Sequence, residues 1–215
     1  MITIIGAANV DITASPLGRY VPCDSNPSRV EISYGGVGRN IAHNLCLMGE
    51  QVRLFTVFGD DSIALSLRDD CTRPLYIDAT SAAKSMKIRS LLGIGRQAPL
   101  IVKVNHAEAV ALSGIKGDVE AMARWFVQQG VSRIFITMGS RGVYCSDGEQ
   151  SFALPSQAVT VVNATGAGDA FMAAVVHAEL HGASMQEACA AGIKAAALAL
   201  QSPTSVNPNI NKLNN

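Results

Sequence analysis

The sequence predicts an α/β fold of three layers, in which a mostly parallel sheet carries helices on both faces. Strand-like and helix-like segments alternate along most of the chain, and this alternation is typical of parallel strands joined by crossover helices. Apolar residues make up 48% of the 215 residues, which is enough for the core of one domain with a small appendage. Residues 12–34 interrupt the alternation and are expected to form part of a small β lid.

In the first half of the chain the predicted elements are short and apolar. Residues 2–7 contain three isoleucines and form the first predicted strand. A helix is predicted over residues 40–48 and ends at Gly49, because glycine commonly follows the last helical residue. The next predicted strands are apolar runs of strand length, namely residues 52–58, 75–78 and 100–104.

The second half of the chain contains longer helices. Residues 119–129 are predicted as a helix that begins after Asp118, a good N-cap, and ends before Gly130. A strand over residues 133–138 continues the sheet, and a Ser-Asp-Gly-Glu-Gln turn predicts an antiparallel hairpin of residues 142–145 and 151–153. The last expected elements are a strand end at residues 160–162, a helix from Ala170, a closely packed alanine-rich helix over residues 184–200, and a loosely held tail after Gln201.

The predicted lid differs in composition from the rest of the chain. Prolines at positions 16, 22 and 27 and a glycine at position 18 break regular structure there. Residues 29–34 then alternate polar and apolar side chains, which predicts a strand exposed to water on one face, as in a lid over a cleft. We therefore expect an α/β domain of residues 1–11 and 35–215, with residues 12–34 as part of the lid.

The composition argues against several classes of partner. The chain has 17 basic and 17 acidic residues, so no excess charge favours a nucleic acid. No apolar run is long enough to cross a membrane, and the first six residues lack the basic region of a signal peptide. The five cysteines are widely spaced and form no C-x-x-C pair, as expected for free thiols in a reducing compartment. We expect a cytoplasmic protein that binds small molecules and neither nucleic acid nor membrane.

The most informative motif lies in residues 162–171, where a predicted strand end, a glycine turn and a helix start meet. Gly166 and Gly168 allow backbone N–H groups to converge at the helix N-terminus, which favours an anion such as phosphate. Asp169 lies in the first turn, where a carboxylate is useful if it takes a proton from a hydroxyl that attacks a phosphoryl group. Taken alone, the motif is explained equally well by an ordinary helix with an acid in its first turn.

Two motifs near the N-terminus are suited to binding a second ligand. Asn9 and Asp11 follow the first strand, and an Asp there can accept hydrogen bonds from sugar hydroxyls or simply cap a turn. Gly35 and Gly36 open the next helix and allow close approach of a ligand, while Asn40 offers both a donor and an acceptor. A tight strand-to-helix turn is the competing explanation for these glycines.

Two further motifs follow later strands. Asn105 and Glu108 lie on one side of a helix's first turn, which suits a magnesium–phosphate unit, although an ordinary capping arrangement is favoured for them alone. Residues 137–142 leave a strand and enter the hairpin, where they can contact a nucleotide or simply form a turn.

In this order and spacing, the motifs together resemble the PfkB family of carbohydrate and nucleoside kinases, which have the three-layer ribokinase-like fold. Residues 35–49 match the first glycine-rich motif of the family, and residues 163–171 match the second. The resemblance implies that Asp169 is the catalytic base, beside an anion hole built from residues Gly166, Ala167 and Gly168 and the Asp169 N–H. It implies three further sets of contacts: Asn9, Asp11, Gly35, Gly36 and Asn40 for the acceptor; Thr137, Gly139 and Gly142 for the nucleotide; and Asn105 and Glu108 for magnesium-bound phosphate, with Glu108 acting indirectly through water or phosphate.

Within the family, several stretches resemble the bacterial pseudouridine kinases. These stretches are residues 24–27, 35–42, 78–84, 112–114 and 163–170. This likeness implies ATP-dependent phosphorylation of the ribose 5′-hydroxyl of pseudouridine, with ATP and Mg²⁺ bound. Another ribosyl or nucleoside kinase of the same fold and a catalytically silent, ligand-binding remnant are the alternatives, and a homodimer formed through the lid is a further expectation.

The chain also departs from the family pattern at three points. Asn163 stands where many members have an Asp that helps to bind a monovalent cation, which leaves potassium activation open. Val104 replaces the proline often found before Asn105. The chain is shorter than the roughly 300 residues usual in the family, and the junctions at residues 62–65 and 93–97 are the expected places of the difference. Either the polypeptide carries a deletion there, or the full protein contains residues that this sequence lacks.

Overall fold

The computed structural model describes residues 2–7, 9–55, 75–78, 92 and 99–214, and the junctions expected at residues 62–65 and 93–97 lie outside this part. Its strands are β1 (Ile2–Ile5), β2 (Asn9–Pro16), β3 (Ser28–Gly35), β4 (Val52–Phe55), β5 (Leu75–Asp78), β6 (Leu100–Asn105), β7 (Arg133–Thr137), β8 (Val143–Ser146) and β9 (Ser151–Leu154). Its helices are α1 (Val37–Leu47), α3 (His106–Ser113), α4 (Val119–Gln128), α5 (Ala167–Leu180) and α6 (Met185–Leu200), with 3₁₀ turns η3 (Gly139–Arg141) and η4 (Pro208–Asn214).

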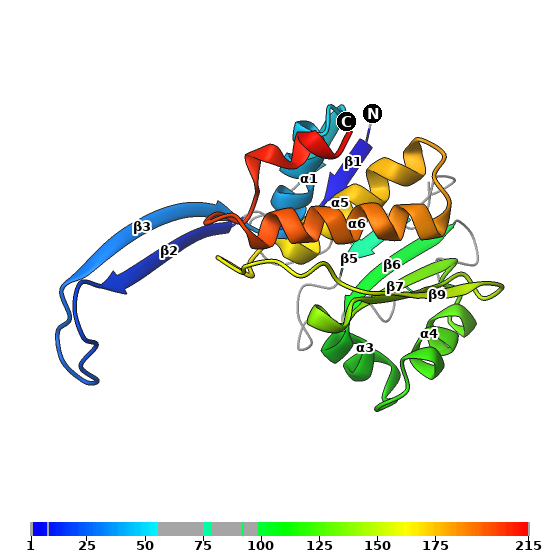
Figure 1. The fold of residues 1–215 in the computed structure, drawn as a ribbon, viewed down its shortest axis with the longest axis horizontal. Coiled ribbons are helices and arrows are strands. Elements are labelled where there is room, and N and C mark those ends of the chain that lie inside the picture. Colours follow the sequence, from blue (N-terminus) through cyan, green and yellow to red (C-terminus); the bar gives the residue numbers. More distant parts are fainter. Residues whose placement is uncertain (1, 8, 56–74, 79–91, 93–98, 215) are drawn as a thin grey trace.

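The body of the molecule is a layered α/β structure, as the sequence predicts. Strands β5, β6 and β7 are parallel neighbours, and the hairpin β8–β9 continues the same sheet in antiparallel pairing. Strands β1 and β4 form a separate parallel pair. Helices α3 and α4 lie on one side of the five-stranded sheet, and α5 and α6 lie on the other (Figure 1). The predicted fold class is therefore confirmed.

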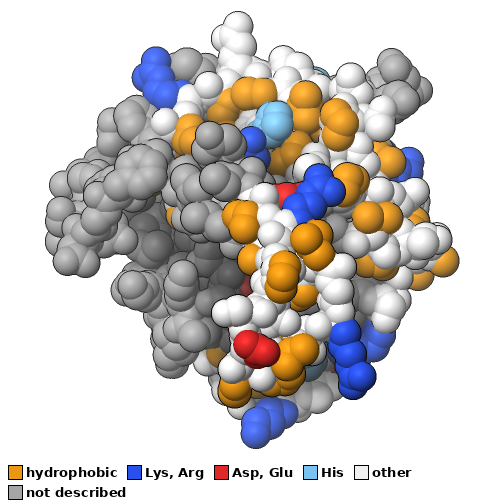
Figure 2. Space-filling view, turned by 90° about the vertical axis from the view of Figure 1, so that its left-hand side faces the viewer, with side chains coloured by type: hydrophobic (Ala, Val, Ile, Leu, Met, Phe, Trp, Pro, Cys, Tyr) orange, Lys and Arg blue, Asp and Glu red, His pale blue; other side chains and the backbone are white. Residues whose placement is uncertain are grey.

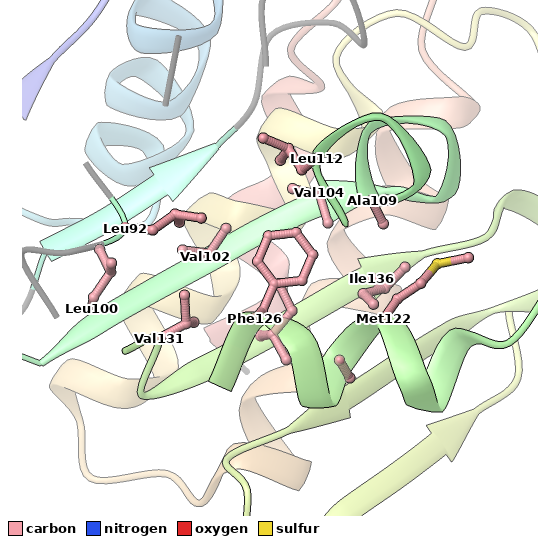
Figure 3. Close-up of a cluster of buried hydrophobic side chains, with 12 residues drawn as sticks. Leu92, Leu100, Val102, Val104, Ala109, Leu112, Met122, Phe126, Val131 and Ile136 are labelled. Atoms are coloured by element: carbon pink, nitrogen blue, oxygen red, sulfur yellow. The ribbon is translucent and has the colours of Figure 1, made fainter. Parts of the chain in front are cut away.

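Strand β6 shows how the two faces of the sheet are assigned. Because successive side chains of a strand point to opposite faces, Leu100, Val102 and Val104 pack under α3 and α4 with Phe126 (Figure 3). Ile101 points the other way and packs in the cluster beneath α5 and α6. The same alternation places Lys103, the charged residue of β6, on the α5 face, where it is only 6% exposed.

Helices α5 and α6 form the closest helix pair, as predicted from the alanine content. A Cβ added at Gly192 of α6 would lie 2.6 Å from the ring of Phe171 on α5, so a larger residue there would separate the helices. The small side chains permit this approach, and α5 also contacts strand β5 of the sheet.

The lid is a two-stranded antiparallel hairpin that extends away from the body (Figure 1). Strands β2 and β3 pair in register from Asn9 opposite Gly35 to Pro16 opposite Ser28. The expectation of one wet face is not met in the described part of the hairpin, where side chains on both faces are exposed and Val30 is 60% exposed. No layer of the body covers the described part of either face, because the hairpin projects from the α/β domain.

Two predicted segments near the C-terminus differ from the structure. Residues 160–162 are not a strand; the Val162 N–H donates to the carbonyl of Leu200 (2.8 Å), so the loop is fixed to the end of α6 rather than to a sheet. The tail after Gln201 is not loosely held, because Ile210 is fully buried against Met48 and helices α5 and α6. Local propensity favoured a strand and a free tail, and tertiary packing decided otherwise.

Two general expectations concern the cysteines and membrane-spanning helices. The cysteines of the described residues, at positions 23, 46, 145 and 189, are free thiols. Among the described helices, none has both the length and the apolar character needed to cross a membrane.

Candidate active site

The site is built around the first turn of α5. Gly166 is the N-cap residue, with φ 85°, and no side chain caps this end of the helix. The helix starts at Ala167 rather than at the predicted Ala170, so Asp169 is its third residue. The first N–H groups of a helix have no partner within the helix, and here they are left without a capping side chain beside a carboxylate. The helix start therefore has the character of an anion site.

Glycine is required at position 166 for two separate reasons. Its positive φ is rarely adopted by residues with a side chain. In addition, an added Cβ would lie 2.0 Å from the carbonyl oxygen of Ser205. The segment after α6 therefore packs directly against the glycine turn through Ser205. The sequence did not predict this contact.

Asp169 is buried and held by a residue from the opposite end of the sequence. Its side chain is only 8% exposed, and its Oδ2 accepts a hydrogen bond of 2.7 Å from Nδ2 of Asn40 on α1. The Oδ1 of Asn40 accepts in turn from Nη1 of Arg39 (3.2 Å) and from Oγ of Ser205 (3.4 Å). Asn40 is therefore fixed in the orientation that presents its amide N–H to Asp169.

Helix α1 begins in the same way as α5. Its N-cap is Gly36, with φ 97°, and no side chain caps it, so the helix starts at Val37, before the predicted residue 40. Gly38 lies against Gly6, and a Cβ added at Gly38 would be 2.6 Å from the Gly6 Cα. Gly38 thus lets the start of α1 approach Gly6 at the exit of β1, and Asn40 is directed toward α5.

Lys103 supplies positive charge at the same place and was not predicted. A Cβ added at Gly168 would be 2.5 Å from Nζ of Lys103, so this side chain reaches the first turn of α5. Burial raises the pKa of Asp169, whereas the hydrogen bond from Asn40 and the charge of Lys103 oppose this rise. A single lysine within the apolar run of residues 100–104 was the signal that could have revealed it.

The pair Asn105 and Glu108 forms a capping box at the start of α3. Oδ1 of Asn105 accepts from the N–H of Glu108 (2.9 Å), and Oε2 of Glu108 accepts from the N–H of Asn105 (2.7 Å). This is the capping arrangement that the sequence alone favoured. Glu108 is only 2% exposed, and burial raises its pKa against the opposing effects of the Asn105 N–H and the Lys103 charge. Lys103 therefore lies in the electrostatic field of both carboxyl groups.

The predicted nucleotide residues lie at the end of β7, next to this capping box. Thr137 pairs in register with Asn105 across the parallel ladder. Gly142 has φ 91°, and a Cβ added there would lie 2.0 Å from the Leu154 carbonyl oxygen, so its glycine is needed by the hairpin. Gly139 also has a positive φ, but open space surrounds its Cβ position. The hairpin turn therefore explains why residue 142 is a glycine. The open space at Gly139 leaves room for a ligand.

The predicted acceptor residues divide into two groups. Asn40 contacts Asp169, and Gly36 lies at the start of the same helix, α1. Asn9 and Asp11 lie on β2, opposite Gly35 and Ser33 of β3, and only their backbone is described. The base of the lid hairpin therefore joins the glycine-rich start of α1, which places these predicted residues in one continuous segment of the structure.

Comparisons with known proteins point to the family that the sequence motifs resemble. A family model described as pfkB family carbohydrate kinase matches residues 1–74 and 74–212. Pseudouridine kinase of Escherichia coli is 28% identical over 99% of this chain and 94% of its own length, and an uncharacterized sugar kinase of the same organism, YeiI, is 26% identical over 96% of this chain and 80% of its length. The crystal structure of ribokinase from Thermotoga maritima superimposes with a TM-score of 0.74 at 18% identity, covering 99% of this chain and 97% of the other.

The same comparisons support an internal difference in length, although the matched segments meet at neither of the two expected junctions. The two segments matched by the family model meet at residue 74. The alignment with the E. coli pseudouridine kinase spans 300 positions, whereas the chain has 215 residues. At least 85 aligned positions therefore have no residue in this chain, which agrees with the internal shortening expected from the sequence.

Proposed function

Because the chain belongs to the PfkB family of carbohydrate kinases, we propose that it transfers a phosphoryl group from ATP to the 5′-hydroxyl of the ribose of pseudouridine. The observation that carries this proposal is the buried Asp169, held by Asn40 at the uncapped, glycine-rich start of α5. A carboxylate beside a ready anion site suits a reaction in which a hydroxyl loses a proton as it attacks phosphorus.

In this proposal Asp169 accepts the proton of the attacking hydroxyl. The raised pKa of Asp169 makes it a stronger base than an exposed aspartate, and the Asn40 amide holds its Oδ2 in place. The N–H groups of Ala167, Gly168 and Asp169 are oriented at the helix start, where negative charge develops on the transferred phosphoryl group. Lys103, which reaches Gly168, adds a positive charge that complements the same group.

The nucleotide and magnesium are assigned to the adjacent strand ends. Thr137 and Gly139 lie at the end of β7, beside Asn105 at the end of β6. Buried Glu108 and the Asn105 amide are oxygen donors of the kind that suits magnesium-bound phosphate. Magnesium bound there would neutralise phosphate charge. Since both side chains already close the capping box, we assign them an indirect contact through water or phosphate.

The acceptor is the least constrained part of the proposal. The likeness to the E. coli pseudouridine kinase favours pseudouridine, but the similar identity to a sugar kinase supports the alternative of another ribosyl or nucleoside kinase. The internal shortening supports the third possibility, a catalytically silent remnant. The presence of Asp169, Gly166, Gly168 and Glu108 argues against that remnant.

A substrate panel tests these alternatives directly. The purified chain is incubated with ATP and Mg²⁺ and with pseudouridine, uridine, adenosine, ribose or fructose 6-phosphate, and phosphorylated product is measured by mass spectrometry. We expect pseudouridine to give the highest kcat/KM. Equal or faster turnover of a plain sugar selects the alternative kinase, and nucleotide binding without turnover of any acceptor selects the remnant.

We also propose that the lid hairpin joins two copies of the chain in the cytoplasm. An isolated two-stranded hairpin is marginally stable in water. This hairpin also exposes the apolar side chains of Leu17, Tyr20 and Val30, and contact with a second copy would bury them. Figure 2 faces the side from which the hairpin projects, and apolar side chains are spread over it. Light scattering should give a dimer mass that Val30→Glu reduces to a monomer mass; a monomeric wild-type chain contradicts this proposal.

A further inference from the structure

The C-terminal end of α5 carries a second group of polar side chains, separate from Asp169. His177 and His181 are four residues apart and therefore lie on the same side of the helix. Glu50, in the turn between α1 and β4, faces them. A helix rises about 1.5 Å per residue, so this cluster lies about 12–18 Å along α5 from Asp169. It takes no part in the proposed phosphoryl transfer.

The three side chains converge on a small volume. Oε1 of Glu50 lies 2.8 Å from Nδ1 of His177 and 3.6 Å from Nδ1 of His181. The candidate ligand atoms of the three residues all lie within 4.8 Å of one another, and the two imidazole centroids are 4.4 Å apart. In a tetrahedral zinc site with bonds of 2.0–2.1 Å, ligand atoms are about 3.3 Å apart. The two separations from Glu50 lie on either side of this value.

The burial of the cluster also suits a bound ion. The side chains of Glu50 and His177 are 19% and 20% exposed, whereas that of His181 is 62% exposed. Two ligands are therefore held by the fold, and the third can turn toward an ion that enters from solvent. His181 now makes a hydrogen bond of 2.8 Å to the carbonyl oxygen of His177, a contact that it would give up on binding.

We propose that Glu50, His177 and His181 form a binding site for Zn²⁺ or a similar transition-metal ion. Two imidazoles and one carboxylate suit zinc, whereas Mg²⁺ and Ca²⁺ prefer oxygen ligands. Three protein ligands leave the fourth position to water. The ion connects the α1–β4 turn to the end of α5 and so stabilises the packing of α1 on α5, the two helices that also hold Asn40 and Asp169.

Zinc binding is measured on the complete chain, freed of metal by chelation, without nucleotide or acceptor. Competition with a chromophoric zinc indicator should give one zinc site per chain that millimolar Mg²⁺ does not displace. His181→Ala and His177→Ala should each weaken binding at least about tenfold, since even outer-shell partners of metal ligands contribute 10–100-fold. The matched control is His43→Ala, which removes an exposed histidine on α1. This variant should bind zinc as tightly as the wild type.

Thermal unfolding supplies an independent measurement. A zinc concentration of 100 times Kd should raise the Tm by about 5–10 °C in the wild type and in His43→Ala, but not in His181→Ala. His181 is exposed, so its substitution leaves the hydrogen bond between His177 and Glu50 intact and keeps the test valid if His177→Ala folds poorly. Absence of zinc binding overturns the proposal. Binding that survives both substitutions also overturns it and would direct attention to the exposed Cys23 and Cys46.

Discussion

The described helices begin in two different ways. Helices α3, α4 and α6 are capped by the side chains of Asn105, Asp118 and Ser184, each of which accepts a hydrogen bond from an N–H of the first turn. Helices α1 and α5 begin at Gly36 and Gly166, both at positive φ, and no side chain caps either of them. The two uncapped helices are also the two that meet through the bond between Asn40 and Asp169.

The two kinds of helix start have different consequences: side-chain caps stabilise the fold, whereas glycine starts are suited to binding ligands. A side-chain cap satisfies donors that would otherwise lack a partner and contributes about 1 kcal/mol to stability. A glycine start forgoes that contribution and can leave N–H groups for a ligand, as at α5, although at α1 the Arg39 N–H already donates to the Ala7 carbonyl (3.2 Å). We conclude that the chain keeps its two uncapped helix starts where ligands are expected to bind, the phosphoryl group at α5 and the acceptor at α1.

Replacing the carboxylate at the uncapped start of α5 should abolish turnover without weakening the fold. Asp169→Asn keeps the shape and can still accept from Asn40, but it cannot take a proton, so we expect kcat to fall by about 10²–10⁴-fold with ATP binding retained. Steady-state kinetics and nucleotide titration measure the two effects. A variant that keeps more than about a tenth of wild-type kcat contradicts the assignment of Asp169 as the base.

Asp169→Asn should also change the free energy of unfolding in a pH-dependent way. Burial raises the pKa of Asp169, so the folded chain binds this proton more tightly than the unfolded chain. The ionised carboxylate therefore destabilises the folded state at neutral pH, and this cost disappears as the pH falls through the raised pKa. Asp169→Asn should unfold at an equal or higher denaturant concentration than the wild type at pH 7, and this advantage should shrink on acidification.

Gly166→Ala should damage both the fold and the activity, because the backbone and the neighbouring segment both require glycine. The matched control is Gly182→Ala at the other end of α5, where φ is 83° but no atom lies within 4 Å of the added Cβ. Positive φ alone costs about 1–2 kcal/mol, so the control measures that cost. Gly166→Ala should lose more, because its Cβ meets the Ser205 carbonyl. Equal losses in urea unfolding would show that the contact with Ser205 is unimportant.

Lys103→Met should shift the pH dependence of catalysis. The charge of Lys103 lowers the pKa of Asp169, so its removal raises that pKa further and moves the acid limb of kcat/KM to higher pH. Lys103→Arg, which keeps the charge, should leave the limb close to its wild-type position. An unchanged acid limb in Lys103→Met would mean that Lys103 does not act on the base.

The uncapped starts could be predicted from the sequence because their determinants are local. Gly166, Gly168 and Asp169 lie within four residues, and glycines permit positive φ and close backbone approach wherever they occur. The partners that hold this turn are distant in sequence: Ser205 is placed by the packing of the tail, and Lys103 by the alternation of β6. The same packing placed residues 160–162 in a loop despite their β-branched character. Local patterns therefore predicted most of the elements, whereas the exposure of the hairpin and the contacts between segments required the folded chain.

The smallest effect concerns a side-chain cap that is also a candidate ligand. Serine is as good an N-cap as asparagine, so Asn105→Ser should keep the α3 capping box and leave the free energy of unfolding within a few tenths of a kcal/mol. If Asn105 also positions magnesium-bound phosphate, the shorter side chain should raise the KM for ATP several-fold. Ser184→Ala is the opposite control: it removes the α6 cap, should cost about 0.5–2 kcal/mol, and should leave the KM unchanged because α6 begins away from the proposed nucleotide residues. An unchanged KM in Asn105→Ser would assign Asn105 to capping alone and would leave the glycine start of α5 as the anion site.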